Sequence, residues 1–331
     1  MAICIDTEFK LKGYIESLIG GRSENQDSAG ALDTKIGTVI TVCDGMGGLA
    51  GGKTASMIAV KTIIDDVASA LRCDDPESVL TQAIIHANEE IIKAGNENPN
   101  LKGMGTTVTA AIVNRDCVTV AHVGDSRIYQ LRGHEKIFRT DDHSQVFELV
   151  KAGAITEEQA RNSGNSNVIL NALGVFDSVE PEVHKLPYLS GDRFVLCSDG
   201  FWGAQPEKDF LALVTEKGDI GEVVKNSCAE VDLIGIKSGS HHDNLTAAIF
   251  ELGCDSKMKI PMRKSVKIAL LSMTALLVAS VALNIVALKH NKDMRPKADA
   301  VDTYIDSLAA NRDSLMCVKY LTQTIDSLST K

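Results

Sequence analysis

The sequence predicts an α+β fold that is followed by one C-terminal transmembrane helix. Three features indicate this: short runs of β-branched residues that come in groups, two long helical stretches that follow one another, and one uncharged apolar run near the C-terminus. Grouped strands and paired helices differ from the βαβ alternation of parallel-sheet proteins. The strands are therefore expected to form antiparallel sheets.

Six runs are predicted to be strands because they are short, rich in β-branched residues and bounded by turns; they span residues 35–43, 106–113, 117–123, 127–131, 193–197 and 245–250. Short turns such as Asn114-Arg115-Asp116 join neighbouring runs, as in hairpins. Residues 51–71 and 76–94 are predicted to be long helices, and Pro76 stands where it can open the second one.

The transmembrane helix is predicted for residues 268–288, which read IALLSMTALLVASVALNIVAL without a charge. At about 1.5 Å per residue this run reaches about 31 Å, enough to cross a bilayer core. The alternative is a buried core helix, which is usually shorter and keeps one polar face. The expected organisation is a globular domain over 1–255, a basic juxtamembrane linker over 256–267, the span at 268–288 and a short tail over 289–331.

Basic residues flank the apolar run on both sides in similar number, so charge alone does not orient it. The N-terminus MAICIDTEFK has no secretory signal. The globular domain over 1–255 is therefore expected in the cytoplasm, at the inner face of the cell membrane, with the tail across the bilayer. In that tail, apolar residues at heptad-like spacing fit a self-associating helix or a solvated, frayed one.

The composition excludes some classes of function. The net charge is -10 and the pI about 5.3, whereas a nucleic-acid-binding protein needs a basic face. The eight cysteines form no Cys-x-x-Cys pair, so they are interpreted as reduced thiols and not as zinc ligands. The composition is therefore that of an acidic globular protein, and a cluster of metal-binding carboxylates would add to its negative charge.

Two segments run from an apolar strand straight into Asp-Gly: TVCDGMGG with Asp44 and VLCSDGFW with Asp199. A strand end holds a carboxylate rigidly, and the glycine after it lets the backbone turn sharply towards a ligand. Asp-Gly is also an ordinary hairpin turn, so the third acidic segment, HHDNLTAAIF with Asp243, is needed to make a constellation. Carboxylates without a histidine-rich set favour Mg²⁺ or Mn²⁺ over zinc.

Near the N-terminus, the segment RSENQDS contributes Arg22 and Asp27. An arginine can grip two phosphate oxygens with its planar fork, which lysine cannot do with the same geometry. Taken alone, Arg22 is better explained by a surface ion pair with Glu24.

These segments belong to a larger ordered set: RSENQD, CDGMGG, GMGTT, HVGDSRIY, TDDHS, NALG, CSDGFW and DNLT. The set resembles the metal-dependent serine/threonine protein phosphatases of the type 2C family, especially their bacterial members, over nearly all of residues 10–250. The resemblance implies a four-layer α-β-β-α sandwich with two antiparallel sheets. It also identifies residues 145–170 with the family's variable flap beside the active site.

The resemblance implies a role for each acidic residue. Asp44 matches the ligand that bridges two Mn²⁺ or Mg²⁺ ions, and the Gly45 carbonyl completes one of them. Asp199 and Asp243 match the remaining ligands. Three further residues complete the site: Asp27 matches an acid that orients water, Arg22 matches the phosphate clamp, and Asp125 resembles a ligand of a third, weaker metal.

The implied activity is hydrolysis of phosphoserine and phosphothreonine in proteins by a hydroxide between the two ions, in opposition to a serine/threonine kinase. Two other functions stay open from the residues: a silent, membrane-anchored phosphoprotein scaffold, and a hydrolase of small phosphate esters. The chain departs from some relatives at Gln26, Met46 and His242. Because Met46 stands where others carry a general-acid histidine, the leaving serine oxygen is expected to take its proton from metal-bound water.

Four other residues receive structural interpretations. His143 and Ser144 are adjacent, but no nucleophile elbow supports a hydrolase triad. His122, on an apolar strand, is expected in the core or behind the site, and Trp202 is expected to pack beneath the Asp199 turn.

Overall fold

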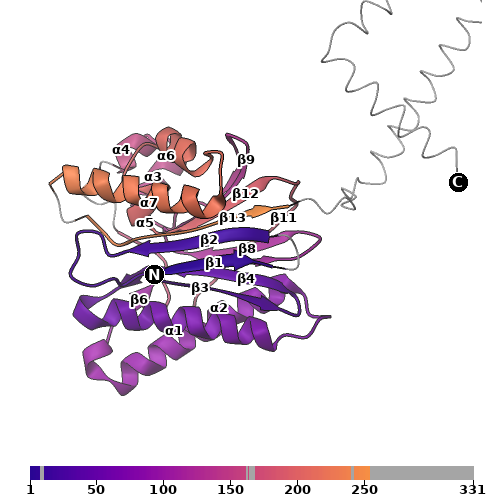
Figure 1. Cartoon of the computed structure of the whole chain (residues 1–331). Coiled ribbons are helices and arrows are strands. Elements are labelled where there is room, and N and C mark those ends of the chain that lie inside the picture. Colours follow the sequence, from indigo (N-terminus) through magenta and orange to yellow (C-terminus); the bar gives the residue numbers. More distant parts are fainter. Residues whose placement is uncertain (8–10, 162, 164–167, 240–241, 254–331) are drawn as a thin grey trace, which may run out of the picture. The chain divides into compact units, whose positions relative to one another are not determined.

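A computed structural model describes residues 1–7, 11–161, 163, 168–239 and 242–253. Two antiparallel sheets stack face to face, and helices cover both outer faces (Figure 1). The predicted α+β class is confirmed. The predicted span at 268–288, the linker and the tail lie outside the described residues. Within the described part of the chain, no helix combines the length and apolar character needed to cross a bilayer.

The first sheet has six strands, in the spatial order β1 (Ala2–Asp6), β2 (Leu11–Leu18), β13 (Leu245–Leu252), β12 (Asp192–Cys197), β9 (Arg127–Arg132) and β10 (Glu135–Arg139). The second has five, in the order β11 (Glu182–Leu186), β8 (Val118–Val123), β7 (Val108–Val113), β4 (Gly37–Cys43) and β3 (Ser28–Thr34). A short ladder joins β5 (Gly45–Met46) to β6 (Gly105–Thr106). All six predicted strands are present, with ends within about two residues.

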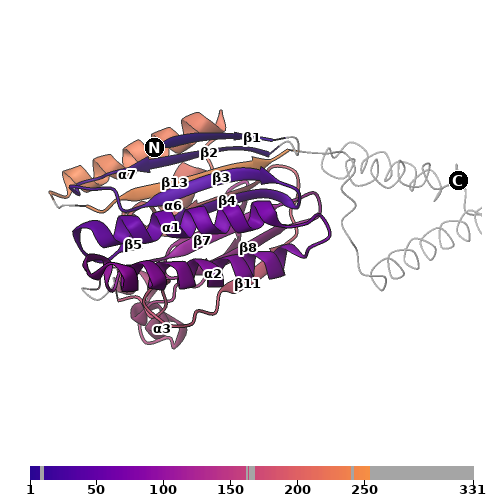
Figure 2. The ribbon, with the colours of Figure 1, turned by 90° about the horizontal axis from the view of Figure 1, so that it is seen from below.

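The helices are α1 (Gly48–Ser69), α2 (Pro76–Glu97), α3 (Gln145–Lys151), α4 (Glu157–Arg161), α5 (Asp199–Trp202), α6 (Glu207–Val214) and α7 (Ile220–Lys237), with a 3₁₀ turn at Pro99–Leu101. Helices α1 and α2 lie side by side across the five-stranded sheet (Figure 2). As predicted, Pro76 opens α2, and the Asp75 carboxylate caps it by accepting a hydrogen bond from the Ser78 N–H.

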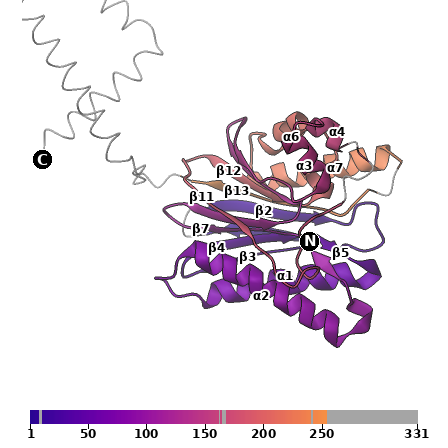
Figure 3. The same ribbon diagram turned by 180° about the vertical axis from the view of Figure 1, so that it is seen from behind.

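Three apolar layers hold these elements together. The middle layer lies between the sheets, where Phe194 and Phe250 stack with ring centroids 5.3 Å apart. The other two lie under α1 and α2 and under α6 and α7. Helices α3 and α4 lie near α6, on the same side of the molecule as α7 (Figures 1 and 3). Burying the sheets on both faces fixes strand register, because a slip of one residue would turn polar side chains into the core.

Candidate metal centre

Register in the five-stranded sheet brings two of the predicted acids together. Ser28, the first residue of β3, pairs with Cys43, the last residue of β4. Asp27 and Asp44 therefore lie one residue beyond the same paired strand ends. Both chains leave the sheet at this edge.

The six-stranded sheet brings together the other two predicted acids, Asp199 and Asp243. Cys197, at the end of β12, pairs with Ala247 near the start of β13. Asp199 lies just after β12 and Asp243 just before β13, so both stand at the same end of this antiparallel strand pair.

The carboxylates from the two sheets are close enough to repel one another. Burial and the charges of Asp27, Asp199, Asp125 and Asp243 hold the pKa of Asp44 well above its usual range. Burial, with a smaller contribution from Asp199 and Asp243, raises the pKa of Asp27 to about 7. The pKa values of Asp199 and Asp125 are also raised, chiefly by burial and then by a neighbouring aspartate. A bound cation would relieve this repulsion.

Several carboxylate oxygens in this cluster accept no hydrogen bond from the described residues. Among the described residues, Oδ1 of Asp27, Asp125 and Asp199 is buried without a hydrogen-bond partner. A buried carboxylate oxygen left unpaired is costly, and it is a ligand type that Mn²⁺ and Mg²⁺ prefer. No three of the aspartate ligand atoms lie within 4.8 Å of one another in the described part of the chain. Mg²⁺ usually keeps several bound waters, so the aspartates need not all contact one ion directly.

Glycine is required directly after two of the acids. A Cβ at Gly45 would overlap the carbonyl oxygen of Gly52 and approach that of Gln26 to 2.6 Å. A Cβ at Gly200 would overlap the carbonyl oxygen of Asn244. The chain therefore packs backbone against backbone at both Asp-Gly steps, which keeps the carboxylates at fixed positions.

Neighbouring polar groups orient the acids. The Ser198 hydroxyl donates to Asp27 Oδ2 at 2.8 Å, and the Thr107 N–H donates to the Asp44 carbonyl at 2.8 Å. Neither residue was singled out from the sequence. Ser198 lies in the motif CSDGFW and Thr107 in GMGTT. The hydroxyl residues in these motifs were the signal from which such supporting contacts could have been predicted.

Arg22 stands at the edge of the cluster. Its Nη2 lies 2.7 Å from Asp243 Oδ2, and the two side chains are 50% and 39% exposed. The alternative pairing with Glu24 is not found, because Glu24 instead faces Lys53 at 3.4 Å. An arginine is thus held beside the acids in a position open to solvent.

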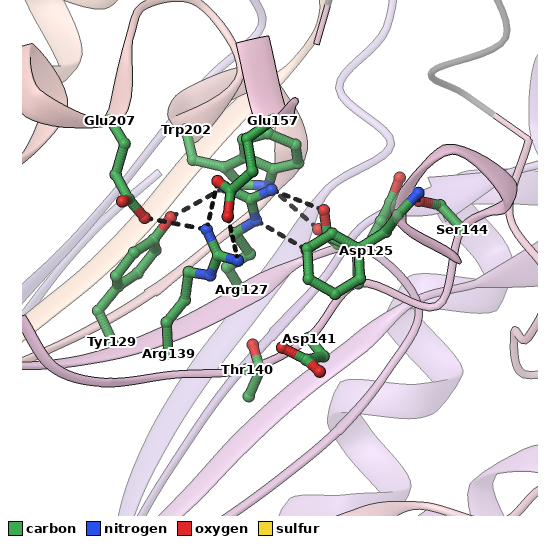
Figure 4. A network of polar contacts seen from close by, with 12 residues as sticks. Asp125, Arg127, Tyr129, Arg139, Thr140, Asp141, Ser144, Glu157, Trp202 and Glu207 are labelled. Atoms are coloured by element: carbon green, nitrogen blue, oxygen red, sulfur yellow. Dashed lines mark hydrogen bonds and ion pairs between the residues drawn. The ribbon is translucent and has the colours of Figure 1, made fainter. Parts of the chain in front are cut away.

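Asp125 is supported from behind by an aromatic and an arginine (Figure 4). The Trp202 indole N–H donates to the Asp125 carbonyl at 3.1 Å. Over the indole ring, at 3.3 Å from its centroid, lies the Arg127 guanidinium, which also makes a bidentate pair with Asp142 at 2.7 and 2.6 Å. Trp202 was predicted to pack beneath the Asp199 turn. The structure adds that its indole N–H holds the Asp125 carbonyl.

The segment over 145–161 is tied to the same region. Arg139, at the end of β10, makes a bidentate pair with Glu157 of α4 at 2.8 and 3.0 Å and also reaches Glu207 of α6 at 3.1 Å (Figure 4). Phe147 of α3 and Ala160 of α4 line a pocket together with Asp125. The helices of the predicted flap therefore border the surroundings of Asp125.

The positions where the chain departs from some relatives have structural partners. His242 Nε2 lies 2.7 Å from Asp232 Oδ1 on α7, so its ring turns to the helix. The Gln26 N–H donates to Asn244 Oδ1 at 2.8 Å. Met46 is half-buried in the short ladder with Gly105.

Comparisons with known proteins agree with this geometry. The family model described as protein phosphatase 2C matches residues 16–230. The serine/threonine phosphatase stp of Listeria monocytogenes is 35% identical over 234 residues, which cover 70% of this chain and 91% of that protein.

Solved structures give the same result. The catalytic domain of the serine threonine protein phosphatase PstP, solved in complex with two manganese ions, is 30% identical with a TM-score of 0.64, over 74% of this chain and 99% of that one. The S. agalactiae serine/threonine phosphatase is 32% identical with a TM-score of 0.64, over 72% and 98% of the two chains. The chain therefore belongs to the protein phosphatase 2C family, and it is a serine/threonine phosphatase.

Proposed function

We propose that this phosphatase acts at the aspartate cluster, where Asp44, Asp199, Asp243 and the Gly45 carbonyl hold two Mn²⁺ or Mg²⁺ ions. Asp125 is assigned to a third, weaker ion. The observation that carries the proposal is a buried set of mutually repelling carboxylates with unpartnered oxygens. When bound, such ions supply an acidified water at neutral pH and neutralise charge on the phosphoryl group.

The chain's own residues then have distinct tasks. Asp27 is assigned to orient water and accept its proton, because the Ser198 hydroxyl fixes its Oδ2 while its buried Oδ1 has no partner among the described residues. Arg22 is assigned to bind the phosphate. Its present pair with Asp243 is exposed, and exposed pairs contribute only about 0–1 kcal/mol, so the guanidinium can turn to a substrate at little cost. Met46 has no proton to donate, so the leaving oxygen takes its proton from water.

The substrates are proposed to be cytosolic phosphoserine and phosphothreonine proteins, and the partner enzyme a serine/threonine kinase whose products this chain reverses. The activity of relatives named serine/threonine phosphatase supports the substrate class. Nothing basic in the overall composition suggests nucleic acid as a partner, since the net charge is -10.

The first prediction concerns the central ligand. Asp44→Asn or Asp199→Asn removes a charge that holds the ions, and Mn²⁺-dependent phosphate release from a phosphothreonine peptide should fall at least about a hundredfold, because a bound cation contributes several kcal/mol to charge stabilisation. The exposed Asp116→Asn is the matched control and should retain activity. Unchanged turnover in Asp44→Asn would contradict the metal assignment, and equal rates on free phosphoserine would favour a small-ester hydrolase.

The second prediction concerns stability without metal. The folded pKa of Asp27, about 7, lies above the value of 3.8 for an unperturbed aspartate. The unfolded chain therefore binds fewer protons between pH about 4 and about 7, and the metal-free protein should lose stability as pH rises through that window.

Thermal unfolding of chelator-treated protein at pH 5 and pH 8 measures this loss. Mn²⁺ should reverse it at pH 8, and Asp27→Asn should lessen the pH dependence because an amide does not titrate, while the raised carboxyl groups of Asp44, Asp125 and Asp199 still contribute. A metal-free protein that is more stable at pH 8 than at pH 5, with the same slope in Asp27→Asn, would show that the cluster carries no such strain.

We further propose that residues 268–288 anchor the enzyme in the cell membrane with the catalytic domain in the cytoplasm. The support is the uncharged apolar run itself. The full chain should sediment with membranes and resist extraction by high salt or carbonate, whereas a chain ending at residue 260 should be found in the soluble fraction. Equal partition of the two forms would remove the anchor from the proposal.

A further inference from the structure

A second cluster of possible ligands lies outside the aspartate centre. His122 is on β8, Glu182 begins β11, and antiparallel pairing sets these two residues opposite one another. His143 comes from the loop before α3. The ligand atoms of the three residues all lie within 4.8 Å of one another. The phosphatase mechanism uses none of them.

The buried member, His122, has the hydrogen bonding of a metal ligand. Its Nε2 lies 2.8 Å from the Asp141 carbonyl oxygen, which can only accept, so Nε2 carries the ring proton. The other nitrogen, Nδ1, is buried and has no hydrogen-bond partner among the described residues. Histidines that bind metals commonly donate their second ring N–H to a carbonyl in this way. Burial also lowers the pKa of His122 to about 4, so the ring is neutral at pH 7.

The other two residues face the same space. His143 Nε2 lies 3.6 Å from Glu182 Oε2, and the two imidazole rings have centroids 4.5 Å apart. The other Glu182 oxygen accepts a hydrogen bond from His184 at 2.7 Å. Although burial opposes it, this bond and the nearby histidines hold the pKa of Glu182 below its usual value. The group therefore offers one carboxylate and two imidazoles.

We propose that His122, His143 and Glu182 form a binding site for a transition-metal ion of the zinc class. Imidazole nitrogens favour Zn²⁺ and related ions, whereas carboxylate and water ligands favour Mn²⁺ and Mg²⁺, so this site and the aspartate centre select different metals. Two imidazoles and one carboxylate leave a fourth position for water in a tetrahedral arrangement. Glu182 and His143 are partly exposed, which gives an ion a path from solvent.

Occupation of this site has a consequence for the loop that carries Asp125. His143 Nδ1 accepts a hydrogen bond from the Gly124 N–H at 3.2 Å, so Nε2 holds the ring proton. An ion that binds Nε2 takes the place of the proton there. The imidazole stays neutral by carrying its proton on Nδ1 instead, so no proton is gained or lost. The new N–H faces the Gly124 N–H, and the hydrogen bond between them is lost.

Gly124 directly precedes Asp125, and its carbonyl accepts a further hydrogen bond from the His143 backbone N–H at 2.9 Å. A change in how His143 is held is thus passed directly to this loop. Metal binding at the histidines therefore shifts the Asp125 loop. The effect on catalysis rests on the proposed role of Asp125, whereas the metal site itself does not.

Co²⁺ is a spectroscopic probe for the site because its geometry reports its ligands. The full chain is titrated with Co²⁺ in excess Mg²⁺, which competes for the aspartate centre. We expect one Co²⁺ with the intense visible absorption of tetrahedral coordination, displaced by Zn²⁺. Glu182→Gln should weaken this binding at least about tenfold, since even loss of an outer-shell partner does so. Glu180→Gln removes an exposed charge two residues away and should bind as the parent chain does.

Absence of the tetrahedral spectrum in the parent chain, or equal affinity in Glu182→Gln with an unchanged unfolding temperature, would overturn the site. The loop shift has its own readout, independent of catalysis. Trp202 is the only tryptophan and donates to the Asp125 carbonyl. Zn²⁺ should change its fluorescence in the parent chain and not in Glu182→Gln at the same concentration. Constant emission while Co²⁺ binds would overturn the coupling to Asp125.

Discussion

The structure depends on bringing like charges together in a place that water scarcely reaches. Asp27, Asp44 and Asp199 leave strand ends from two different sheets, and burial raises the pKa of each. Folding alone gains nothing from this arrangement, because buried carboxylates without counter-charges destabilise a protein. A divalent cation would turn this repulsion into binding, which is why the aspartate cluster is proposed as the metal centre of the phosphatase.

The surrounding residues keep that strained cluster in place. Backbone packing at the Asp-Gly steps leaves no room for a Cβ, so the carboxylates cannot drift apart by shifting the turn. Behind Asp125, Trp202 and the buried Arg127–Asp142 pair form a stiff support. A buried pair of this kind specifies geometry more than it adds stability, since removing either partner leaves an uncompensated charge. Arg22, by contrast, pairs with Asp243 in a position open to solvent, as its proposed role of binding the phosphate requires.

The sequence was informative where chemistry and local structure coincide. Apolar strands that run into Asp-Gly predicted the positions of Asp44 and Asp199, and β-branched runs predicted strands such as β4 and β7. Strands β1, β2 and β3 were not predicted, because their pairing partners lie far along the chain and strand propensity depends on those neighbours. The cluster of His122, His143 and Glu182 was missed for the same reason: only the register between β8 and β11 brings it together.

The most direct measurement is anomalous diffraction at the manganese absorption edge from crystals of the catalytic domain soaked in Mn²⁺. Two strong peaks should lie against the Asp44 carboxylate, one of them also against Asp199 and Asp243, because two ions are needed to offset the clustered negative charge. Peaks elsewhere, or none, with the aspartates unliganded at saturating Mn²⁺, would contradict the account.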